Sequence, residues 1–287
     1  MNSIIRFLVC LFFLVAVNKI IAQPQDKTYH ILLQATDKSI TESALKDSYS
    51  ILNKRLIAFG FQKTELIPSK DKTQISLQLS DNQDLGIPEY LLTSKGSLAF
   101  YETYSRSSLM SLFKENKPML ALLNKIAKDS INANSLACIP VDRVAEINQL
   151  LNRSGDNIYC LFAWGEEPEN ASLCLYALKI TTDPESNLKS SDIKSINIVR
   201  DYGTGHHQVN MEFTAEAKAK WATLTARNIN KPIAVTIDNK VYFAPVLRSK
   251  IENAQCVISG DFTKEQLMLF SAIANNGELP SSFTIVK

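Results

Sequence analysis

An amphipathic segment flanked by strand-like runs constrains the fold of this chain more than any other feature. Apolar residues recur at steps of four and three from Leu45 to Phe59, which places them on one face of a helix. Ser39 and Glu42 stand at the spacing of a capping box, and Gly60 supplies a left-handed stop. Such a helix is stable only when its apolar stripe is covered, so we expect it to pack on a sheet.

Strand-like patterns surround this helix in a recognisable order. Tyr29 to Ala35 precedes it, and Thr64 to Ile67 and Gln74 to Leu79 follow it as a hairpin. A short helix near Pro88 to Thr93 and a strand from Leu98 to Tyr104 complete a β-α-β-β-α-β order. The order predicts a ferredoxin-like unit in which the Leu98 to Tyr104 strand is the last of the sheet.

The rest of the chain predicts a second α+β unit. Asp238 and Asn239 separate two alternating apolar runs, and both residues tolerate the positive φ that a tight hairpin turn needs. Thr263 and Gln266 have capping-box spacing before a last helix that Gly277 ends. Further strands are expected at Ile158 to Trp164, Leu173 to Ile180, Ile193 to Arg200 and Gln208 to Phe213, the last leading into a helix capped by Thr214.

The N-terminus has the layout of an export signal. Arg6 precedes an apolar run from Phe7 to Val17, and Lys19 to Ala22 leads into polar sequence. The run is about half of the ~20 residues that span a bilayer, which favours a cleaved export signal rather than an anchor. We therefore expect residues 1–22 to form a signal peptide that is cleaved after Ala22. We therefore expect a periplasmic protein, which would be membrane-anchored if the segment were not cleaved.

Charge and residue patterns exclude several classes of function. The chain carries 31 Lys and Arg against 29 Asp and Glu, and Arg6 and Lys19 account for that excess. A neutral chain without a basic run is unsuited to phosphate backbones, so we expect no nucleic-acid partner. We find no paired nucleophile and base and no metal-ligand spacing. We therefore expect no enzyme activity, no metal, no cofactor and no small-molecule substrate.

Four cysteines follow the export signal: Cys138, Cys160, Cys174 and Cys256. Export places them in an oxidising space, where four thiols allow three pairings, and the sequence does not choose among these. No Cys-x-x-Cys spacing occurs, which argues against a zinc site. The role of small apolar core residues is favoured for most of them.

Several short stretches occur in the order and spacing of one known family. They are I-A-V-T-I-D-N-K-V-Y-F-A-P-V-L from Ile233, I-S-G-D-F-T-K-E-Q from Ile258, N-N-G-E-L-P from Asn275, F-T-A-E-A from Phe213, L-F-A-W-G from Leu161, L-Y-A-L-K from Leu175, N-K-R-L from Asn53 and G-S-L-A-F from Gly96. They resemble the first periplasmic domain of the SecD and SecDF protein-export family. The resemblance is weakest over Ser105 to Asn157.

The resemblance implies a ferredoxin-like base subdomain that carries an inserted α+β head subdomain. The base would comprise residues 23–104 and 281–287, and the head residues 105–280. Phe283 to Val286 is then a candidate closing strand of the base. The chain lacks the family's membrane helices, through which proton movement supplies energy, so we expect no proton-coupled motor of its own.

The resemblance also implies contact with translocating or unfolded polypeptide in Sec-dependent export, beside the Sec translocon or a full-length SecDF. Such contact needs exposed apolar surface or a free strand edge. Tyr242, Phe243, Leu247 and Phe262 are the candidate polypeptide-binding residues, with burial in the core as the plain alternative. The rival hypothesis is a repurposed envelope module that binds a folded protein partner. Glu252-Asn253-Ala254, where the family usually has a glycine pair, favours this rival.

Overall fold

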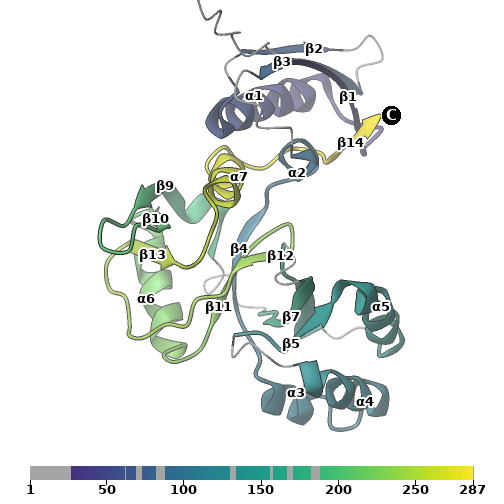
Figure 1. Ribbon diagram of the computed structural model, residues 1–287, viewed down its shortest axis with the longest axis vertical. Helices are drawn as coiled ribbons and strands as arrows, with labels where there is room; N and C mark the ends of the chain where they lie inside the picture. Colours follow the sequence, from purple (N-terminus) through teal and green to yellow (C-terminus); the bar gives the residue numbers. More distant parts are fainter. Residues whose placement is uncertain are drawn as a thin grey trace, which may run out of the picture.

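Four groups of elements make up the computed structural model: a sheet with its helices at the top of Figure 1, two lobes below it, and a central sheet between the lobes. None of the helices in the part of the chain described is both long and apolar enough to cross a membrane. The predicted export signal, residues 1–22, lies outside the described residues. Those residues are 27–61, 63–68, 73–81, 88–129, 134–155, 158–166, 171–181 and 188–286.

The upper sheet has the ferredoxin-like arrangement that the sequence predicts. Its strands lie in the order β14-β1-β3-β2, and every neighbouring pair is antiparallel. One face of the sheet is covered by helices (Figure 1). The elements are β1 (Lys27–Ala35), α1 (Glu42–Phe59), β2 (Lys63–Pro68), β3 (Gln74–Asp81), α2 (Glu89–Thr93) and β14 (Phe283–Val286).

The predicted last strand of this sheet is placed wrongly by the sequence. Residues from Leu98 do form a strand, β4 (Leu98–Glu102), but it pairs with β11 (Ile233–Ile237) and β8 (Leu188–Lys189) in another sheet. The base sheet is closed instead by β14, from the opposite end of the chain. Local alternation specifies that a strand forms, but it does not specify the partner of that strand.

Helix α1 buries the predicted apolar face. Leu45, Leu52, Leu56 and Phe59 are each at most 4% exposed. The predicted capping residue was wrong by two positions, because Thr41 rather than Ser39 accepts the hydrogen bond of the first turn, from the Ala44 N–H.

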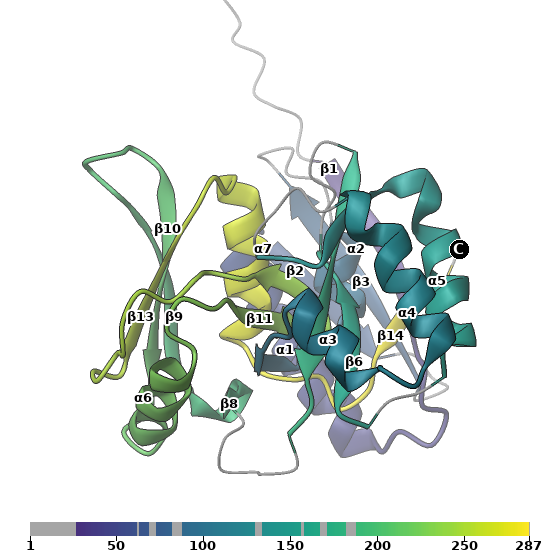
Figure 2. The same ribbon diagram turned by 90° about the horizontal axis from the view of Figure 1, so that it is seen from below.

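The first lobe contains a three-stranded sheet in the order β13-β10-β9 (Figures 1 and 2). Its inner face forms one continuous apolar core with α1 and the base sheet, because α7 packs between them. Thr263 and Gln266 make the predicted capping box of α7. Thr214, the predicted cap of α6, accepts from the Ala217 N–H, but the residue that directly precedes the helix is Glu216, whose side chain makes no capping bond. The elements are β9 (Ile193–Arg200), β10 (His207–Phe213), α6 (Ala217–Arg227), β13 (Gln255–Ser259) and α7 (Lys264–Ala274).

The second lobe and the central sheet complete the fold. The second lobe has its own apolar core, between the sheet β5-β7-β6 and three helices. The central sheet, β12-β11-β4-β8, lies between the lobes in Figure 1. The predicted hairpin turn is confirmed, with φ of 51° at Asp238 and 63° at Asn239. The elements are α3 (Arg106–Leu112), α4 (Lys117–Lys125), β5 (Ala137–Pro140), α5 (Val144–Arg153), β6 (Cys160–Trp164), β7 (Ser172–Lys179) and β12 (Lys240–Phe243).

One buried arginine joins the base to both connections that lead out of it. The guanidinium of Arg55 in α1 donates to the carbonyls of Ser94 (2.8 Å), Lys95 (2.9 Å) and Gly277 (2.7 Å). Asp238 continues the junction, since its carboxylate accepts from the Gly96 N–H at 3.1 Å. The path of the chain between base and lobes is therefore fixed by side-chain bonds to main-chain groups.

Candidate functional site

Three of the four predicted polypeptide-binding residues meet in an aromatic cluster between β12 and α7. The ring of Phe243 lies 4.9 Å from that of Phe262 and 4.7 Å from that of Phe270, and Tyr242 lies 5.4 Å from Phe270. Phe243 is only 5% exposed, whereas Tyr242 and Phe262 are partly exposed. The cluster therefore acts mainly as packing between the central sheet and α7.

Leu247, the fourth predicted residue, lies apart from this cluster. Its side chain is 6% exposed, so it offers little surface to a partner. Its main chain has a different role, since its N–H donates to the carbonyl of Lys231 (3.1 Å) and its carbonyl accepts from the N–H of Asn230 (2.8 Å). These two bonds hold the segment that forms one wall of a cleft.

This cleft, which we call the interlobe cleft, has a volume of about 400 Å³. Four separate segments line it, so its shape depends on the tertiary fold. They come from the β4 to α3 junction (103–108), the segment before β5 (134–136), β7 (176–179) and the segment before β11 (230–232). The lining contains hydroxyl, amide and phenol groups beside short apolar surfaces, a mixture that suits both main-chain and side-chain groups of a peptide.

Hydrogen bonds join the 103–108 wall to each of the other three walls. The N–H of Tyr104 donates to the Ala177 carbonyl (2.8 Å), and the hydroxyl of Thr103 donates to the Pro232 carbonyl (3.1 Å). Arg106 donates to the carbonyl of Leu136 at 2.8 Å, and burial lowers the pKa of its guanidinium. The cleft is consequently preformed, with little main chain left to order on binding.

The cleft is lined by three cationic side chains, Arg106, Lys179 and Lys231, and by no carboxylate among the described lining residues. Glu102 stands behind it, 3.0 Å from Lys179 and 3.2 Å from Arg227. Burial favours the neutral form of Glu102, but hydrogen bonds from Lys179 and Asn228 and the charges of Lys179 and Arg227 together outweigh it and lower the pKa of this carboxyl. Glu102 thus stays ionised and holds Lys179 beside the cleft.

An exposed apolar patch adjoins the cleft beyond Tyr104 and Lys179. Ile158 is 72% exposed, Tyr159 is 51% exposed and Ile180 is 38% exposed. The carbonyl of Tyr159 accepts from the Ile180 N–H (3.0 Å) and from the Tyr104 hydroxyl (3.4 Å), which joins the patch to the cleft wall. Apolar side chains grouped in this way are a common feature of surfaces that bind partners.

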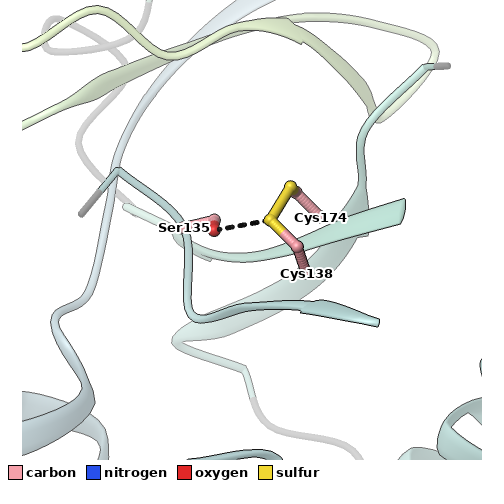
Figure 3. Close-up of a disulfide and its surroundings, with 3 residues drawn as sticks. All are labelled: Ser135, Cys138 and Cys174. Atoms are coloured by element: carbon pink, nitrogen blue, oxygen red, sulfur yellow. Dashed lines mark hydrogen bonds between the residues drawn. A yellow bond between two sulfur atoms is a disulfide. The ribbon is translucent and has the colours of Figure 1, made fainter. Parts of the chain in front are cut away.

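A disulfide ties two of the cleft walls just behind the lining residues. Cys138 in β5 bonds to Cys174, its register partner in β7, and the hydroxyl of Ser135 lies 3.5 Å from the Cys138 sulfur (Figure 3). The bond closes a loop with a sequence separation of 36 residues, a constraint worth about 4 kcal/mol in the chain-entropy account. Cys160 and Cys256 are free and buried, so the core role that was expected for most of the four cysteines holds for these two, while the other two form the disulfide.

Sequence reasoning missed the interlobe cleft. Its walls come from segments more than 100 residues apart, and no local pattern joins Tyr104 to Lys231. The one local signal for the cleft was in β7, where the polar groups of Tyr176 and Lys179 interrupt a run of apolar residues. Among the described residues, no cluster of three or more His, Cys, Asp or Glu could hold a metal ion.

A known family model matches part of the chain. Residues 175–281 match the family described as SecDF, P1 head subdomain. This range includes β7 from Leu175 onward, the cleft segment before β11, and all of β9, β10 and β13. It begins well after Ser105, where the sequence placed the start of a head subdomain.

Curated relatives agree with this match. The chain is 34% identical over 93 residues to the protein translocase subunit SecDF of Thermus thermophilus, covering 32% of this chain and 12% of that protein. It is 36% identical over 94 residues to SecD of Aquifex aeolicus, covering 33% and 18%. SecD of Petrotoga mobilis aligns over 248 residues at 23% identity, covering 84% and 45%. The chain thus spans less than half the length of each of these relatives.

Solved structures show the same fold over most of the chain. A SecDF structure described as a membrane component that enhances protein export is similar with a TM-score of 0.51 and 20% identity, covering 90% of this chain and 98% of that one. A SecDF structure in a super-membrane-facing form is similar with a TM-score of 0.53 and 20% identity, covering 92% of this chain and 30% of that one.

Proposed function

Because residues 175–281 match the SecDF P1 head subdomain and the fold is similar to that of SecDF structures, we propose that this protein binds translocating or unfolded polypeptide during Sec-dependent export. It acts on the periplasmic side of the membrane, beside the Sec translocon or a full-length SecDF.

One observation carries the proposal: a preformed cleft beside exposed apolar surface, with the head subdomain contributing its β7 and 230–232 walls. An extended polypeptide presents amides and carbonyls along its length together with apolar side chains. The hydroxyl and amide groups of the cleft can bind the amides and carbonyls of such a chain. The patch of Ile158, Tyr159 and Ile180 can contact its apolar side chains. The three lining cations favour segments that carry acidic residues or a terminal carboxylate.

We retain the division into a base of residues 23–104 with 281–287 and a head of residues 105–280 as part of this proposal, with one amendment. β4 belongs with the head, because it pairs with β11 and β8. The amended boundary lies at Ser94 to Gly96, where Arg55 holds the outgoing connection.

Crosslinking in cells during active export tests the proposal. A photoreactive phenylalanine analogue replaces Tyr159 in the apolar patch or, as a matched control, Ile57 on α1, whose side chain is similarly exposed at 56%. We expect the probe at Tyr159 to capture many different exported chains and the probe at Ile57 to capture few. Mass spectrometry of the adducts identifies the captured proteins.

Two outcomes would overturn this function. Capture of a single folded protein from Tyr159, with no exported chains, would favour the rival envelope module that binds a folded partner. Equal capture of exported chains from Tyr159 and Ile57 would mean that contact is unselective and that the cleft and its patch have no part in it.

A further inference from the structure

The sheet of the first lobe ends in an open strand edge. Among the described strands, β13 pairs only with β10, so its other side faces away from the sheet. Its side chains alternate, with Cys256 and Ile258 in the core at 7% and 2% exposure and Val257 on the outer face at 56% exposure. Five residues of regular strand are therefore available at a surface that has an apolar side chain at its centre.

The hydrogen-bond pattern shows which main-chain groups point outward. The N–H of Phe213 donates to the carbonyl of Ala254 at 2.8 Å, which fixes the parity of the antiparallel ladder. Every second residue from Ala254, namely Cys256 and Ile258, then directs its main-chain N–H and C=O toward β10. Gln255, Val257 and Ser259 direct their main-chain groups outward, and no described residue forms a main-chain bond with them.

The opposite edge of the same sheet is covered where it meets α7. The side-chain amide of Asn275 pairs with both main-chain groups of Ile196 in β9: its oxygen accepts from the N–H at 2.8 Å, and its nitrogen donates to the carbonyl at 2.7 Å. The hydroxyl of Ser271 donates to the same carbonyl at 3.4 Å. The Asn275 amide thus satisfies the outward main-chain groups of Ile196 as a neighbouring strand would, and so closes the β9 edge at that point. In the described part of the chain, no side chain does the same for β13.

The edge also lacks the usual protection against pairing. Exposed edge strands are commonly blunted by a lysine, a proline or a bulge, and β13 contains none of these in its sequence Gln255-Cys-Val-Ile-Ser259. An uncharged edge places no demand on the charge of the partner strand. Main-chain pairing at such an edge accepts many sequences, which is the property needed by a protein that meets many different chains.

We propose that an extended segment of the polypeptide pairs with the outer edge of β13, through the main-chain groups of Gln255, Val257 and Ser259. This inference rests on the proposed function and adds to it a second contact, distinct from the interlobe cleft. The guest segment contributes about five residues in strand conformation, and its side chains alternate between the two faces of the extended sheet.

Peptide titration of the purified protein tests the inference. The probe is a fluorescein-labelled peptide of alternating Thr and Val, about ten residues long, and its twin carries N-methyl groups on alternate residues so that one edge cannot donate. Val257→Pro removes the outward N–H while leaving the bonds to β10 in place, and Val257→Thr is the matched control that keeps the N–H. We expect Val257→Pro and N-methylation each to weaken binding about tenfold or more, and Val257→Thr to bind within about twofold of the original chain.

The outcomes separate this inference from the proposed function. Unchanged affinity in Val257→Pro, or equal affinity for the two peptides, overturns the edge site; exported chains captured at Tyr159 would then still support the cleft. Concentration-dependent dimerisation that Val257→Pro abolishes would show that the edge takes a second copy of this chain, and would also overturn the inference. Because the N-methylated peptide needs no protein variant, a folding defect in Val257→Pro leaves the comparison intact.

Discussion

Replacing Arg55 with methionine should destabilise the protein by about 3–5 kcal/mol, because its guanidinium is the shared donor at the junction of base and lobes. Three charge-assisted hydrogen bonds contribute roughly 5–9 kcal/mol in total at about 1.5–3 kcal/mol each. Burial opposes them, since it lowers the pKa of Arg55 from 12.5 to about 10, a cost of roughly 3 kcal/mol at ~1.4 kcal/mol per pKa unit. The difference leaves the substitution strongly unfavourable.

Urea unfolding followed by tryptophan fluorescence measures this loss. The control is Lys54→Met, one residue earlier on the exposed side of the same helix, which should change the free energy of unfolding by less than about 0.5 kcal/mol. If Arg55→Met costs under about 1 kcal/mol, the carbonyls of Ser94, Lys95 and Gly277 find other donors readily, and the argument that Arg55 fixes the junction is refuted.

Two further predictions concern single positions. Gly96→Ala should cost about 2 kcal/mol more in free energy of unfolding than Gly155→Ala. Both glycines have positive φ (85° and 80°), but only a Cβ at Gly96 would meet the Arg55 guanidinium, 2.1 Å away. Equal losses of free energy for the two variants in urea unfolding would contradict this. Burial raises the pKa of Cys160 and of Cys256 to about 12, so at pH 8 each thiol should hold about a thousandfold less thiolate than in the unfolded chain. Alkylation by iodoacetamide should be correspondingly slow until the chain unfolds, and rapid labelling of the folded protein would show that these thiols are accessible.

Local sequence determined many elements of this protein and some of their ends, although it placed the cap of α1 two positions too early. The apolar spacing from Leu45 to Phe59 predicted α1, and Thr263 with Gln266 predicted the cap of α7, because these signals act within one or two turns of helix. The same holds for Asp238 and Asn239, whose tolerance of positive φ is a property of the residues themselves. The resemblance of short stretches to the SecD family was also available from sequence, and the match over residues 175–281 agrees with it.

Tertiary structure alone decided which strands pair and where surface remains for a partner. β4 reads as a strand, yet only the three-dimensional path of the chain places it beside β11; the base sheet is closed by β14, as the family resemblance implied. Phe243 reads as a candidate for exposure but is buried by Phe262 and Phe270, whereas Val257 stays exposed on an edge strand. Strand pairing, burial and the interlobe cleft depend on contacts between segments far apart in the sequence, and periodicity within one segment carries no information about those contacts.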